Sequence, residues 1–122
     1  MPVRSLTSSV LRWPRPEEVR AAIGTWAAEI VARPDVARIG CFGSLAKGTW
    51  GVGSDVDLVV IIDRSSQPVY RRALEFDAST LPVPADVLVY TTEEWGRITE
   101  GGRDPLGPVE WITPPSLDQP SA

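Results

Sequence analysis

The run Val56–Ile62 (VDLVVII) constrains the fold more than any other feature of the sequence. All of its residues except Asp57 are apolar, and most are β-branched. Such a run predicts a central strand that is buried on both faces. Two further runs with a strand-like composition, Val36–Phe42 (VARIGCF) and 85–90 (ADVLVY), predict two more strands of the same sheet.

Helical signals alternate with these strands. Proline in the first turn, acidic residues after it and apolar residues at helical spacing predict a helix over residues 16–33. A short helix is expected to begin at Ser44, and residues 68–77 have a second helical pattern. Thr91 and Glu94 form a capping-box match for a last helix. The alternation predicts an α/β fold, a small mixed β-sheet with helices packed against it.

The chain of 122 residues suits one compact domain. Eight of the twelve prolines lie up to Pro16 or from Pro105 onwards, which sets the two ends apart from the middle of the chain. We therefore expect residues 1–15 to be an extended N-terminal segment and residues 16–112 to form the domain. Residues 113–122 contain three prolines and no apolar periodicity, so we expect a disordered tail.

The charge and the missing residue types exclude several classes of function. Twelve basic and sixteen acidic side chains give a net charge of −4, which would repel the phosphate backbone of duplex nucleic acid. The chain has no histidine and a single cysteine, Cys41, so zinc sites and internal disulfides are not expected. No segment has the length of a signal-peptide core or of a membrane span. We therefore expect a cytoplasmic protein without a membrane partner.

Three aspartates stand at the beginnings of two predicted strands. Asp55 and Asp57 are two residues apart, so in a strand both side chains leave the same face. Asp86 stands at the beginning of the strand 85–90. If these two strands are neighbours, the three carboxylates converge, and carboxylate oxygens together with substrate phosphates suit two Mg²⁺ ions. The simpler interpretation is that each acid is a solvated residue at the beginning of a strand.

A glycine-serine pair precedes the short helix. Glycine lets the backbone approach a phosphate closely, and the hydroxyl of Ser44 can donate to a phosphate oxygen beside Gly43. Lys47 could neutralise triphosphate charge. Both features also have ordinary interpretations, as a turn and as a solvated surface lysine.

These residues together resemble the signature of the polymerase-beta-like nucleotidyltransferase superfamily. Gly43-Ser44, Lys47-Gly48 and Ser54-Asp55-Val56-Asp57 stand at the family's spacing, and the third acid follows one strand later. The resemblance covers residues 36–90 and is closest to the minimal nucleotidyltransferases (MNT) of bacteria and archaea.

The resemblance implies the nucleotidyltransferase fold and assigns roles to the residues. By resemblance, Gly43 and Ser44 bind the triphosphate, with Lys47 and Ser54 in the same nucleotide site. Asp55 and Asp57 hold both metal ions. Asp86 binds the catalytic metal and helps to deprotonate the acceptor hydroxyl.

The implied activity is transfer of a nucleoside monophosphate, AMP from ATP, to a hydroxyl acceptor. Many minimal nucleotidyltransferases act as antitoxins beside a helical HEPN toxin, in some cases by adding AMP to a tyrosine of that toxin. Two alternatives stay open: a non-catalytic module of the same fold that acts by contact, and an antibiotic adenylyltransferase. Trp13, Trp50 and Trp111, in segments expected to be irregular, are either interface anchors or packed on the domain's own core.

Overall fold

The computed structural model describes residues 13–112. The tail expected at 113–122 and most of the segment expected at 1–15 lie outside this range. The elements, in chain order, are α2 (Pro16–Ile30), β1 (Val36–Phe42), α3 (Ser44–Lys47), β2 (Val56–Ile62), α4 (Val69–Arg72), a 3-10 helix (Ala73–Glu75), β3 (Ala85–Thr91), α5 (Thr92–Ile98), a second 3-10 helix (Glu100–Gly102) and β4 (Glu110–Ile112). None of the helices in the described range has the length and hydrophobicity of a membrane span.

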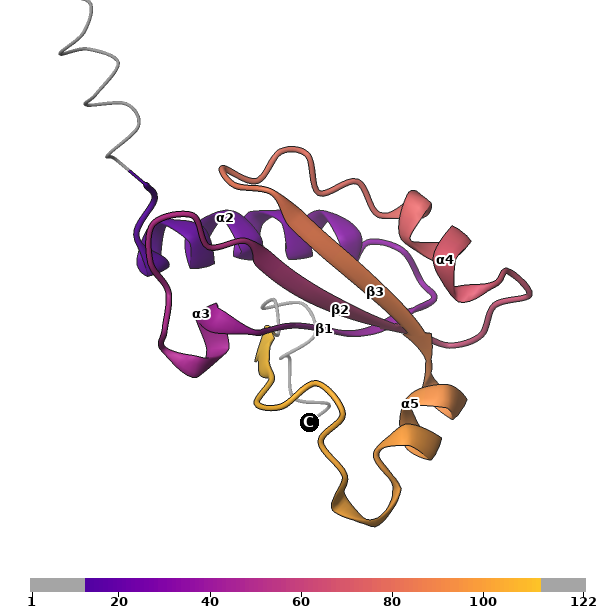
Figure 1. The fold of residues 1–122 in the computed structure, drawn as a ribbon. Coiled ribbons are helices and arrows are strands. Elements are labelled where there is room, and N and C mark those ends of the chain that lie inside the picture. Colours follow the sequence, from indigo (N-terminus) through magenta and orange to yellow (C-terminus); the bar gives the residue numbers. More distant parts are fainter. Residues whose placement is uncertain (1–12, 113–122) are drawn as a thin grey trace, which may run out of the picture.

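The described strands form one mixed sheet in the order β3-β2-β1-β4 (Figure 1). β2 and β3 are parallel, whereas β1 is antiparallel to both β2 and β4. The three predicted strands therefore share one sheet, as expected, and the predicted fold class is confirmed. β4 was not predicted, because three residues after a Gly- and Pro-rich stretch have too little periodicity to indicate a strand.

One face of the sheet packs against α2 (Figure 1). Alternate residues of β2 point to this face, as the two-residue period of a strand requires, and they join the buried side chains of the helix. The cluster includes Val19, Ile23, Trp26, Ile39, Cys41, Val56, Leu58, Val60 and Ile62. α2 ends at Ile30, a turn earlier than predicted, and turns occupy the residues between it and β1.

The opposite face of the sheet is also covered by side chains. Val59 and Ile61 alternate with the core residues of β2 and are also buried, with 0% and 1% of their surfaces exposed. On this side Trp95 of α5 packs against Tyr90 and Trp111, with ring centroids 5.8 Å and 5.7 Å away. Trp111 thus lies in β4 and not in an irregular segment. Trp13 and Trp50 pack against the domain's own core, which favours that alternative for both.

The helix predicted over residues 68–77 is shorter and less regular than expected. Only Val69–Arg72 is α-helical, and Ala73–Glu75 continues as a 3-10 helix. The predicted apolar face does not form, because Phe76 is buried while Val69 stays 40% exposed. A helix this short is marginally stable in water, and its few packed side chains do not stabilise a longer one.

A buried arginine joins α4 to β3 and α5. Arg72 is 5% exposed, and its guanidinium donates to the carbonyl oxygens of Gln67 (2.8 Å) and Val89 (3.2 Å). It also donates to both carboxylate oxygens of Glu94, at 2.6 Å and 3.0 Å. Glu94 completes the predicted capping box with Thr91. The Arg72 guanidinium lowers the pKa of Glu94 to about 2.

Glu94→Gln should destabilise the protein at neutral pH by about 1.5–3 kcal/mol, because the charged hydrogen bonds to Arg72 are lost. The folded-state pKa of Glu94 lies below its usual value, so its stabilising effect is present above about pH 4.5. The effect should disappear as the pH falls from there to about 2. Urea unfolding of both proteins between pH 7 and pH 2 measures it. A free-energy difference between them that is independent of pH would contradict this role.

Candidate active site

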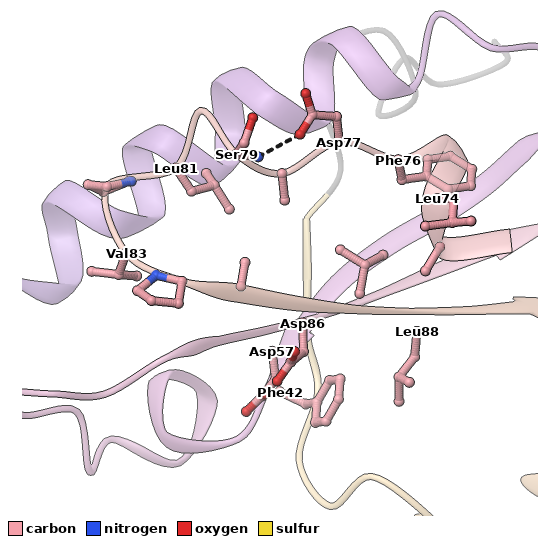
Figure 2. Close-up of a pocket in the computed structure, with 16 residues that line it drawn as sticks. Phe42, Asp57, Leu74, Phe76, Asp77, Ser79, Leu81, Val83, Asp86 and Leu88 are labelled. Atoms are coloured by element: carbon pink, nitrogen blue, oxygen red, sulfur yellow. Dashed lines mark hydrogen bonds between the residues drawn. The ribbon is translucent and has the colours of Figure 1, made fainter. Parts of the chain in front are cut away.

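Two of the predicted aspartates lie side by side at one end of the strands. Asp57 of β2 stands in register with Asp86 of β3, and on its other side it pairs with Phe42 at the end of β1. Because β2 and β3 are parallel and β1 is antiparallel, the beginnings of two strands and the end of a third lie together. The condition that β2 and β3 are neighbours is met. Figure 2 shows the side chains of Asp57 and Asp86 side by side below the sheet.

Asp57 has the most perturbed environment of the three aspartates. Its side chain is half-buried, whereas Asp55 and Asp86 are exposed. Burial raises the pKa of Asp57, and the negative charges of Asp86 and Asp55 raise it further. A group whose ionised form is opposed by burial and by like charges is stabilised by a bound cation.

The chemistry of these donors fits magnesium. Within residues 13–112, no group of three or more acidic or cysteine side chains is placed to hold a metal ion, so the expected convergence of all three aspartates is not found there. Mg²⁺ at phosphate-transferring sites is commonly held by one or two carboxylates, with substrate phosphates and water as its other ligands. The adjacent carboxylates of Asp57 and Asp86 match that pattern. The arrangement therefore favours magnesium bound together with a nucleotide.

Gly43 lies directly against Asp57. Its φ of 74° and ψ of −149° belong to a region that only glycine adopts readily. A Cβ atom at this position would collide with the Oδ2 oxygen of Asp57 and lie 3.2 Å from its Cγ. The sequence suggested glycine here for close approach of a phosphate. The structure adds that the glycine leaves room for the Asp57 carboxylate itself.

Three further predicted residues belong to the segments next to Gly43 and Asp57 in the chain. Ser44 is the first residue of α3, directly after Gly43, and is half-buried. Lys47 ends α3 and is exposed, and its Cε lies 3.8 Å from the position of a Cβ on Gly107. The hydroxyl of Ser54 accepts a hydrogen bond from the backbone N–H of Gly51 at 3.0 Å. This bond gives Ser54 a part in shaping the loop that leads to Asp55.

Comparison with known proteins identifies the family. The family model described as "Nucleotidyltransferase domain" matches residues 25–102, well over half of the chain. The chain belongs to this family.

A solved structure agrees with this assignment in its fold. A protein from Sulfolobus solfataricus, described as a candidate nucleotidyltransferase, superposes with a TM-score of 0.61 at 16% sequence identity. The similarity covers 79% of this chain and 80% of that one. At this identity it shows the nucleotidyltransferase fold alone. A search of the curated proteins finds no match to the sequence.

The family places this nucleotidyltransferase domain in the transferase class, with nucleotidyl transfer as its general chemistry. The matched range contains all of the predicted site residues, which are Gly43, Ser44, Lys47, Ser54, Asp55, Asp57 and Asp86. It begins inside α2 and ends before β4.

The nucleotidyltransferase domain also has apolar side chains at the site that sequence reasoning missed. Phe42 and Leu88 lie on the same side of the sheet as Asp57 and Asp86 (Figure 2). All four line one hollow in the surface. The alternation of side chains along β1 and β3 was the signal that could have identified Phe42 and Leu88, once the register with Asp57 was known.

Proposed function

We propose that this nucleotidyltransferase domain transfers AMP from ATP to a hydroxyl group, with two Mg²⁺ ions bound together with the nucleotide. The observation that carries the proposal is the register of Asp57 with Asp86 on neighbouring parallel strands, with the Gly43-Ser44 turn packed against Asp57. This arrangement places two carboxylates, which a cation would stabilise, beside a turn where a phosphate can approach the backbone.

The proposed step exchanges one bond to phosphorus for another. The acceptor oxygen forms a bond to the α-phosphorus, the bond from this phosphorus to the bridging oxygen of the β-phosphate breaks, and pyrophosphate leaves. The proton of the acceptor hydroxyl passes to the carboxylate of Asp86. The magnesium ions, when bound, neutralise the charge of the phosphates. Asp57 and Asp55 would hold them, and Asp86 would also bind the catalytic one. The backbone at Gly43 and the hydroxyl of Ser44 would position the triphosphate.

For the acceptor we propose a tyrosine of a partner protein, a HEPN-type toxin in the cytoplasm, with this domain as its MNT-type antitoxin. The resemblance to the minimal nucleotidyltransferases supports this partner. Two further features agree with it: the small size of the domain, which would gain from a partner surface, and the exposed position of Asp86 at the site.

A calorimetric titration with magnesium and a non-hydrolysable ATP analogue tests the nucleotide site. We expect each ligand to strengthen the binding of the other. Ser44→Ala should weaken triphosphate binding by about 1.5–3 kcal/mol, roughly ten- to a hundred-fold, because a hydrogen bond to a charged oxygen is lost. AMP should be affected much less. If the wild-type protein binds neither ligand, the domain acts by contact alone and the proposal fails.

A further inference from the structure

The outer edge of β3 is open along half of its length. β3 is the last strand on its side of the sheet, and no described strand pairs with its outer edge. Towards β2, the backbone N–H of Val56 donates to the carbonyl of Pro84 at 3.0 Å. In a parallel ladder the N–H and C=O groups of one residue point to the same side, and successive residues alternate between the two sides. The backbone groups of Asp86 and Leu88 therefore face β2, and those of Ala85 and Val87 face outwards.

The two halves of this edge differ in how they are protected. Further along β3, side chains from α4 and α5 satisfy the outward groups: Arg72 donates to the carbonyl of Val89, and Glu94 accepts from the N–H of Thr91. Among the described residues, no such partner is found for the N–H and C=O groups of Ala85 and Val87. Unpaired strand groups of this kind bind an added strand readily.

A groove of about 1300 Å³ runs along this open half of the edge. One of its walls is the segment 73–83, where Leu74 is 79% exposed, and the strand β3 itself supplies the other (Figure 2). Its charged lining residues are all acidic: Asp57, Asp77 and Asp86. The groove therefore matches an extended segment that carries apolar and basic side chains.

We propose that an extended, basic peptide segment pairs antiparallel with Ala85 and Val87 and presents the acceptor hydroxyl to Asp86. The proposal rests on the proposed function, whose acceptor it specifies. In an antiparallel ladder with hydrogen-bonded pairs at Ala85 and Val87, the residue opposite Asp86 belongs to a non-hydrogen-bonded pair. Such pairs bring Cα atoms to about 4.5 Å, and their side chains lie on the same face of the sheet. The acceptor residue would thus stand beside Asp86, with Asp57 on the other side.

The test uses the full chain and a blocked pentapeptide, Lys-Val-Tyr-Val-Lys, with magnesium and ATP. In the proposed register, the N–H groups of the two valines donate to β3, and that of the tyrosine points away. N-methylation of either valine should lower the efficiency of AMP transfer to the peptide about five- to tenfold, since one hydrogen bond is lost. N-methylation of the tyrosine should change it less than about twofold. Equal loss from all three changes, or loss from the tyrosine change alone, would overturn the proposed pairing.

NMR of the protein without nucleotide reports binding independently of transfer. The peptide should shift the amide signals of Ala85 and Val87 and slow their hydrogen exchange, whereas the Asp86 and Leu88 amides already bond to β2. Transfer of AMP to other hydroxyl compounds without these amide changes would overturn the inference and leave the proposed function standing. Peptide binding without transfer to any acceptor would instead overturn the function. If the two amides are already protected without peptide because the chain dimerises through β3, a second copy occupies the edge and the inference is wrong.

Discussion

Asp57→Asn should lower the rate of AMP transfer by on the order of 10³-fold, because it removes a charged magnesium ligand from the centre of the site. Asp57 lies between Asp86 in β3 and the Gly43 turn, so its carboxylate is central to the candidate site. Transfer of labelled AMP from ATP at saturating magnesium measures the effect. Transfer at the wild-type rate would contradict the assignment of Asp57 to the metal site.

The same substitution should make the metal-free protein more stable. Burial and the charges of Asp86 and Asp55 raise the pKa of Asp57, so its ionised form is disfavoured by folding at neutral pH. Asparagine removes that cost, and the gain should disappear as the pH falls below about 4, where the wild-type carboxyl is protonated in both states. Asp63→Asn is the matched control, because Asp63 is an exposed aspartate that follows the other end of β2. It should change neither transfer nor stability noticeably.

Gly43→Ala should lower both stability and nucleotide binding. The backbone at this position is held in a conformation that costs a residue with a side chain about 1–3 kcal/mol, and the new Cβ would also displace the Asp57 carboxylate. We therefore expect a lower urea midpoint and at least about a tenfold loss of triphosphate affinity, which corresponds to about 1.4 kcal/mol.

Gly48→Ala separates the two causes. Gly48, after α3, also has a positive φ of 78°, yet a Cβ there would meet no atom within 4 Å. This variant should lose about 1–2 kcal/mol of stability from backbone strain alone and keep its affinity for the triphosphate. Equal losses of affinity in both variants would mean that the contact between Gly43 and Asp57 has no part in nucleotide binding.

The parts of the fold that could be predicted from the sequence are those with strong local signals. β1 and β2 begin and end at the predicted residues, and β3 ends one residue later than predicted. The nearly continuous β-branched run of β2 has few alternatives to a buried strand, and the other two runs have a strand-like composition. The capping box that begins α5 was equally clear. The helix after Pro68 was predicted too long, since the apolar spacing of Val69 and Phe76 does not reveal that only Phe76 reaches the core.

The candidate site, like the fold, was predictable where local signals define it and not where long-range contacts do. The types of its residues, their order and their positions at strand ends could be read in the sequence, because a strand alternates its side chains and glycine-serine turns have local preferences. Their convergence depends on long-range contacts. Only the tertiary structure decided that β2 and β3 are parallel neighbours with Asp57 opposite Asp86, and that Gly43 packs against the Asp57 carboxylate.

The sequence by itself thus determined the elements and the chemical character of the site, since local periodicity, turn residues and charge act within a few residues of each other. The order of the strands, the addition of β4 beside β1 and the open half of the β3 edge were decided by tertiary structure. These features depend on which surfaces, far apart in the chain, bury each other. Trp111 can cover the sheet because Gly40, some seventy residues earlier, has no side chain, and no local pattern in the sequence contains that relation.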